Sequence, residues 1–125
     1  MDVKLYDLVV SFDDFKKLME ARGLPAKRNY WLSKLYTKVS HEVEVYGLAE
    51  RKLFDEYGQR VNDMGQYTIP SENISVVEQQ LTELRTMKVE LSFDPVTMNE
   101  LELLGDVLSP ASMARLDWLL QSDIC

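Results

Sequence analysis

One histidine and one cysteine are the side chains of this sequence best suited to proton transfer or metal binding. His41 lies in the middle of a helical pattern, between Ser40 and Glu42. A general base needs a positioned partner and a pocket, and a zinc site needs several histidine or cysteine ligands at fixed spacings. The sequence offers no second histidine, and Cys125 is its only cysteine. We therefore predict no catalytic residue, no metal ligand and no bound cofactor.

The 21 acidic side chains could in number supply a two-carboxylate site, but their spacing disfavours one. Glu100 and Glu102, for example, are two residues apart, and helix neighbours at that spacing do not face each other. Asp13 and Asp14 are expected in the first turn of a helix, where negative charge is favourable. Neither a glycine-rich phosphate loop nor a G-x-S-x-G motif occurs. Nearly all carboxylates are therefore expected on solvated helix faces, and we predict that the protein is not an enzyme.

Basic and aromatic residues alternate over residues 27–38, which makes this segment the main candidate for binding. Such a segment can hold nucleic acid, because aromatic rings stack on bases and cations neutralise phosphates. The net charge of -7 opposes that interpretation, and a protein-binding patch is favoured over it because Trp, Tyr and Arg often anchor interfaces. A purely structural alternative packs Trp31 inward with Leu35, four residues on, and leaves the lysines solvated. The candidate partner-binding residues are Lys27, Arg28, Trp31, Lys34 and Lys38.

Charge and hydropathy limit the possible partners and the compartment further. Residues 88–125 carry seven acids against Lys88 and Arg115, so this part could mimic nucleic acid for a basic cleft; a solvated surface is the simpler interpretation. No apolar run approaches the roughly 20 residues that cross a bilayer, and Asp2, Lys4 and Asp7 interrupt the start of the chain where a secretion signal would be apolar. We therefore expect no membrane partner and a cytoplasmic protein.

The elements that must position these residues begin with a short strand and a helix. Alternation over residues 2–6 predicts a half-buried strand, and Ser11 followed by Asp14 predicts a helix that starts there and ends at Gly23. Pro25 is expected at the first position of the next helix. That helix should span residues 26–57 and stop at Gly58, because apolar residues recur at steps of three and four: Leu32, Leu35, Val39, Val43, Tyr46, Ala49, Leu53 and Tyr57.

The second half of the chain predicts a hairpin partner, a strand and short helices. Ser71 should cap a helix over residues 71–87 that packs antiparallel on the long one through Ile74, Val77, Leu81 and Leu84. Residues 88–93 alternate as a strand, which we expect to pair with residues 2–6. A capping box at Thr97 and Glu100, and a cap at Ser109 before Pro110, predict two short helices. The expected fold is a single α+β domain over residues 1–125, predominantly helical, with a long antiparallel helical hairpin and a small two-stranded sheet.

The order of these features resembles a family of small phage and prophage proteins of uncharacterised function. The resemblance is carried by Leu24-Pro25-Ala26-Lys27 leading into Tyr30-Trp31-Leu32-Ser33-Lys34-Leu35, by residues 51–58, by Tyr67-Thr68-Ile69-Pro70, by Val89-Glu90-Leu91 and by Leu108-Ser109-Pro110. It spans nearly the whole chain, but its motifs are caps, stripes and helix stops. It implies a phage-encoded accessory or virion-related protein and transfers no functional residue.

Three functions remain open from the sequence. The first is a non-enzymatic phage accessory protein that binds and inhibits a host or phage protein, such as a defence or transcription component, in the bacterial cytoplasm. The second is a virion structural or tail-assembly protein that self-associates through a coiled-coil seam on its helical hairpin. The third, and least favoured, is a nucleic-acid-binding accessory protein.

Overall fold

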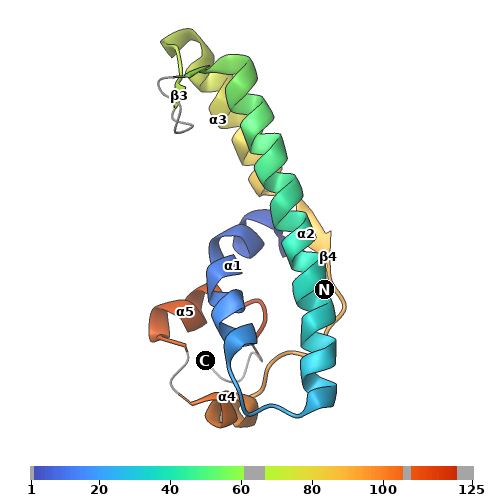
Figure 1. The fold of residues 1–125 in the computed structure, drawn as a ribbon. Helices are drawn as coiled ribbons and strands as arrows, with labels where there is room; N and C mark the ends of the chain where they lie inside the picture. The colour runs from blue at the N-terminus through green and yellow to red at the C-terminus, as the bar shows by residue number, and fades with distance from the viewer. Residues whose placement is uncertain (1, 61–66, 106–107, 121–125) are drawn as a thin grey trace.

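A long helical hairpin rises from a body of shorter helices (Figure 1). The computed structural model describes residues 2–60, 67–105 and 108–120. The body contains α1 (Leu5–Glu20), the first half of α2 (Ala26–Tyr57), α4 (Met98–Leu104) and α5 (Pro110–Arg115). The second half of α2 and α3 (Ser71–Arg85) form the projecting hairpin. The predicted α+β, mainly helical architecture is confirmed.

Helix α2 has the predicted bounds, and its apolar stripe is the seam that faces the rest of the molecule. Leu32, Leu35 and Val39 are buried in the body, and Tyr46 and Leu53 are buried against α3. The helix is about 48 Å long at 1.5 Å per residue, which explains why half of it extends beyond the body. Pro25 is the N-cap residue and not, as predicted, the first helical residue.

The predicted start of the first helix is wrong by two turns. Helix α1 begins at Leu5, so Ser11 lies inside it and is fully buried instead of capping it. The Ser11 hydroxyl donates to the carbonyl of Asp7, one turn earlier, at 2.6 Å. The cause is visible in the spacing, because buried Leu8 extends the stripe of Phe15 back to Leu5 at helical steps. Only Asp2–Lys4 remains for the strand β1.

Gly23 lies beyond the end of α1 and allows the chain to turn close to α4. Its φ is +124°, a conformation that side chains with a Cβ rarely adopt. A Cβ at this position would lie 2.5 Å from the carbonyl oxygen of Leu103. A glycine is therefore required here by backbone conformation and by space. At Gly47, in contrast, a Cβ would meet no atom within 4 Å, so close packing does not require a glycine there.

The expected sheet forms between the N-terminal strand and the strand that follows α3, but it is shorter than predicted. Strand β1 pairs antiparallel with β4 (Lys88–Glu90), and Val3 lies opposite Val89. Because the pairing is antiparallel, with Asp2 opposite Glu90 and Lys4 opposite Lys88, the start of α1 at Leu5 ends the sheet at Lys88, and residues 91–93 extend beyond the end at Asp2. A second small pair, β2 (Gln59–Arg60) and β3 (Tyr67–Thr68), lies at the far end of the hairpin.

The C-terminal helices start where their caps predicted. Thr97 and Glu100 form the capping box of α4, and the Ser109 hydroxyl accepts a hydrogen bond from the Ser112 amide at the start of α5. Helix α3 starts at Ser71 after the N-cap Pro70, so Ser71 is the first helical residue and not, as predicted, the cap; of the predicted inward residues only Val77 is fully buried. Ile74 is 44% exposed, so its predicted inward orientation is wrong.

The main core lies in the body and not along the hairpin. Phe15 is fully buried at its centre, with edge-on ring contacts to Tyr36 at 5.3 Å and to Trp118 at 5.8 Å between centroids. The remaining core is mostly aliphatic and draws on α1, α2 and the C-terminal segment: Val3, Leu8, Leu18, Leu32, Leu35, Val39, Leu91, Val96, Leu104, Leu108, Leu116, Leu119 and Leu120.

Candidate protein-binding surface

Trp31 does not pack inward with Leu35, and this overturns the structural alternative for the basic aromatic segment. The Trp31 side chain is 53% exposed, whereas Leu35 is buried. Tyr30 beside it is 56% exposed, and the two rings meet edge-on at 5.3 Å between centroids. The Lys34 ammonium lies 5.2 Å from the Trp31 ring centroid and 5.3 Å from that of Tyr30. Trp31 lies at the edge of the α2 stripe, where the ring reaches solvent.

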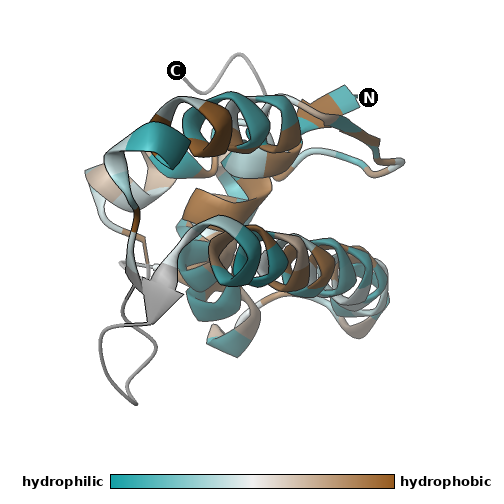
Figure 2. Ribbon diagram, turned by 90° about the horizontal axis from the view of Figure 1, so that it is seen from above, coloured by the Kyte–Doolittle hydropathy of each residue, from teal (hydrophilic) through white to brown (hydrophobic). Residues whose placement is uncertain are grey.

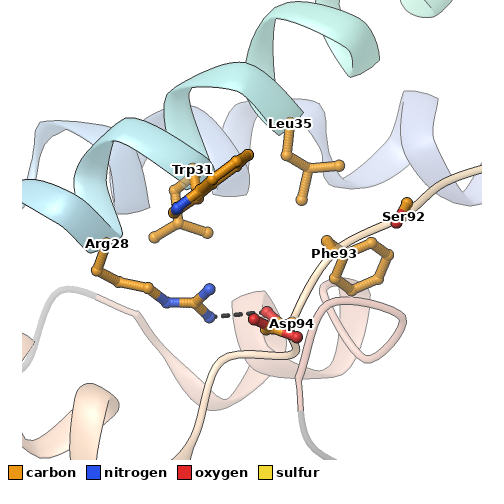
Figure 3. A pocket seen from close by; sticks show the side chains of 7 residues that line it. Arg28, Trp31, Leu35, Ser92, Phe93 and Asp94 are labelled. Atoms are coloured by element: carbon orange, nitrogen blue, oxygen red, sulfur yellow. Dashed lines mark hydrogen bonds between the residues drawn. The ribbon is translucent and has the colours of Figure 1, made fainter.

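A hollow adjoins this aromatic pair. It has a volume of about 280 Å³ and lies between α2 and the segment that follows β4. In Figure 3, Trp31 and Leu35 line it from the helix, and Ser92, Phe93 and Asp94 face them from the other side. Its lining residues are Arg28, Trp31, Leu32, Leu35, Ser92, Phe93 and Asp94. We call the hollow together with Tyr30 and Lys34 the Trp31 surface.

Arg28 has a structural role in the wall of this hollow. A terminal nitrogen of Arg28 donates to the backbone carbonyl of Asp94 at 2.7 Å (Figure 3). The same nitrogen donates to the Pro95 carbonyl at 3.2 Å, and Nε donates to the Glu100 carboxylate at 2.6 Å. The Arg28 side chain is only 17% exposed. Burial raises the pKa of Glu100, but the hydrogen bonds from Arg28 and Thr97 outweigh it and hold that pKa below its usual value. Arg28 therefore fastens α2 to the start of α4 and offers little charge to a partner.

The other two predicted lysines, Lys27 and Lys38, are not part of the Trp31 surface. Lys38 donates from Nζ to the Glu90 carbonyl at 2.8 Å, which links α2 to the end of β4. Lys27 is exposed in the first turn of α2. Of the five predicted residues, Trp31 and Lys34 lie in contact. Arg28 lines the adjoining hollow, and Lys38 is hydrogen-bonded to the Glu90 carbonyl. Tyr30, Leu32, Leu35 and Phe93 complete the surface and were not among the predicted residues.

A buried polar cluster in the body corrects the expectation that Asp14 is solvated. Asp14 is 3% exposed, and its carboxylate accepts from the Ser112 hydroxyl at 2.7 Å and from Arg115 at 2.6 and 3.0 Å. These bonds, chiefly the one from Arg115, hold the pKa of Asp14 below its usual value. Ser11 accepts from the Trp118 indole N–H at 2.8 Å. The cluster joins α1 to the C-terminal segment, and the position of Ser11 and Asp14 on the stripe of Leu8 and Phe15 could have revealed it.

The remaining candidates for chemistry lie scattered. His41 is exposed on α2. Within the described ranges, no group of three or more His, Cys, Asp or Glu residues could hold a metal ion. Of the C-terminal acids, Glu100 is engaged with Arg28, whereas Asp106, Asp123 and the thiol of Cys125 fall outside the described residues. Leu103 on α4 is 58% exposed.

Comparison with known proteins finds no similar sequence or structure. No helix in the described part of the chain is long and apolar enough to cross a membrane. No protein-family model matches the sequence, and neither a curated protein nor a solved structure is detectably similar to it.

Proposed function

We propose that this protein is a non-enzymatic binding protein that recognises another protein through the Trp31 surface. The observation that carries the proposal is the pair of exposed aromatic rings, Tyr30 and Trp31, beside a hollow with a mixed apolar and polar lining. Large rings with half their surface in water lose the free energy of burial, and Trp and Tyr are the residues most enriched at the centres of protein interfaces. The resemblance to phage proteins makes a phage or bacterial host protein the expected partner, with inhibition as the expected effect.

The chemistry of the surface indicates what the partner should present. Leu32, Leu35 and Phe93 line the hollow and suit one apolar side chain of the partner. Lys34 lies over the rings and Lys27 is exposed on the same helix, so acidic residues beside that apolar side chain would be favoured. We therefore expect a partner segment with an apolar anchor flanked by carboxylates.

Nucleic-acid binding receives less support from the same geometry. Arg28 is paired with Glu100, and Lys38 donates to a backbone carbonyl, so two of the four predicted cations are already engaged. Phosphate binding depends on many free cations that release counterions. The three-dimensional arrangement therefore favours a protein partner over DNA or RNA.

Replacement of Trp31 by alanine should abolish most of the partner affinity while leaving the fold intact. Loss of a central interface tryptophan typically costs about 2 kcal/mol or more, which is about thirtyfold in Kd. The measurement is affinity capture from a phage-infected bacterial lysate with wild-type and variant chains, followed by titration of the recovered protein. Acrylamide quenching of Trp31 fluorescence should fall when the partner is added.

The matched control is Ile74→Ala, because Ile74 is similarly exposed but lies on α3, far along the hairpin. It should bind as the wild type does. A partner that binds Trp31→Ala as tightly as the wild-type chain contradicts the proposal. Binding to single-stranded DNA or RNA that weakens steeply with salt would instead favour the nucleic-acid alternative.

A further inference from the structure

The hairpin of α2 and α3 exposes one apolar face along its length. Val45 and Leu48 on α2 are 45% and 51% exposed, Val76 on α3 is 36% exposed, and Met87, two residues after the end of α3, is 56% exposed. Met87 lines a hollow with Gln80 and Glu83, and these follow Val76 by four and seven residues on α3, so Val76 and Met87 lie on one side. Two shallow hollows share Ala49: one lies on α2 beside Val45 and Leu48, and the other lies between α2 and α3 and is lined by Met87 together with Gln80 and Glu83. We call Val45, Leu48, Ala49, Val76 and Met87 the open face.

The other side of the hairpin is occupied by polar contacts and by α1. The Arg85 guanidinium lies 4.6 Å from the ring centroid of Tyr6 on α1, and it donates from Nε to the Tyr46 hydroxyl at 3.0 Å. Tyr46 in turn donates to Glu50 at 2.7 Å. Figure 2, seen from above, shows hydrophobic and hydrophilic residues interleaved along the helices. Among the described residues of the hairpin, the open face is therefore the side that presents apolar side chains at helical steps from both helices.

We propose that a second copy of this chain packs on the open face, with the two hairpins antiparallel around a two-fold axis beside Leu48. Charge along α2 supports this occupant and this register. Glu44 precedes Leu48 by four residues and Lys52 follows it by four, and all three are exposed. A two-fold axis at Leu48 places Glu44 of each copy opposite Lys52 of the other, so two ion pairs flank a central Leu48 contact.

The same axis also relates Val76 of α3 to Met87, which follows α3. The contact of Arg85 with Tyr46, and of Asn73 with Tyr57, sets which α3 residues lie level with Leu48. Between these contacts the axis crosses α3 near Glu83, and it places Val76 of one copy within about three residues, or about 4 Å along the helix, of the level of Met87 of the other. The register that pairs the charges on α2 thus also brings Val76 of one copy near Met87 of the other.

The available area is sufficient for a weak specific dimer. The free part of the hairpin runs from about residue 41 to 57, roughly 25 Å, and two helices side by side are about 20 Å wide. Such a face covers about 500 Å² on each copy, or about 1,000 Å² in all, which is the lower limit of specific interfaces. The product is a four-helix bundle with the two bodies at opposite ends.

Sedimentation of the full chain at increasing concentration tests the dimer. The expected mass rises from 14.5 kDa toward twice that value by about 100 µM, and Glu44→Lys or Lys52→Glu alone should weaken the dimer at least about tenfold. An equimolar mixture of the two variants should regain it, because the mixed dimer contains two opposite-charge pairs. Circular dichroism verifies that each variant remains folded.

Ile74→Lys is the matched control, because Ile74 is exposed on the same hairpin but shares the side of Arg85, eleven residues on. It should leave the dimer unchanged, whereas Leu48→Glu should abolish it. A wild-type chain that stays monomeric at about 500 µM overturns the proposal, and so does a dimer that neither Leu48→Glu nor the charge reversals weaken. If the mixture of Glu44→Lys and Lys52→Glu fails to form a dimer, the proposed pairing of Glu44 with Lys52 is wrong. Trp31→Ala should have no effect, so this test is independent of the binding function.

Discussion

Replacement of Phe15 by alanine is expected to lower the free energy of unfolding by about 4 kcal/mol, the largest loss from any single side chain in the body. Phe15 is fully buried and joins α1 to Tyr36 of α2 and to Trp118 near the C-terminus. Its removal leaves a cavity at the point where three segments meet, and the surrounding backbone can fill it only in part. Urea denaturation followed by circular dichroism measures the change.

Phe12→Ala is the comparison for this experiment. Phe12 is on the same helix and stacks on Tyr36 at 5.4 Å between centroids, but it is only partly buried. Its loss should cost about 2 kcal/mol, roughly half as much, because less apolar surface is removed from water in the folded state. Equal losses for the two variants would show that Phe15 is not the centre of the core.

Asp14→Ala is expected to cost about 3 kcal/mol, although aspartate is seldom found on a core face. The substitution removes two charge-assisted bonds from Arg115 and leaves the buried Ser112 hydroxyl without its acceptor. The exposed neighbour Asp13 provides the control, and Asp13→Ala should change the stability by less than about 0.5 kcal/mol. Similar losses for both would contradict the structural role of the cluster.

The pH dependence of stability follows from the same carboxylate and from Glu100. Each has a folded-state pKa below its ordinary value, which is 3.8 for the aspartate and 4.5 for the glutamate. A depressed pKa means that the unfolded chain takes up protons first, so the stabilisation is complete above about pH 5 and is lost as the pH falls through the folded-state values. Asp14→Ala should flatten the fall in unfolding free energy between about pH 5 and 3. An unchanged slope would exclude Asp14 as a source of the acid sensitivity.

The elements that were correctly predicted are those whose signals are local and agree with each other. In α2, one uninterrupted stripe runs between Pro25 and Gly58, and both bounds were right. At Ser11, two local signals compete, because the capping pattern suggests a helix start and the spacing of Leu5 and Leu8 continues the helix. The stripe prevailed, since the hydroxyl of Ser11 can bond within the helix and accept from Trp118.

The candidate site was predicted only in part, because its details depend on contacts between distant segments. Trp31 and Lys34 were identified from composition and spacing. The structural role of Arg28 depends on Glu100, 72 residues later, and the hollow depends on Phe93, which local sequence does not place beside α2. Ile74 is a case where the local pattern misleads. Its spacing from Val77 fits one helix face, but Val77 is buried and Ile74 is 44% exposed.

The separation of the hairpin from the body has a consequence for how the molecule opens. The far hairpin buries Tyr46, Leu53 and Val77 outside the main core cluster, so its outer turns have few contacts to break. Their amide hydrogens should exchange with solvent through local openings, while those around Leu8 and Leu119 exchange only when the whole chain unfolds. If two chains pair, the exchange of amide hydrogens in the outer hairpin turns should slow as the protein concentration rises. The exchange of the amide hydrogens around Leu8 and Leu119 should report only the free energy of unfolding.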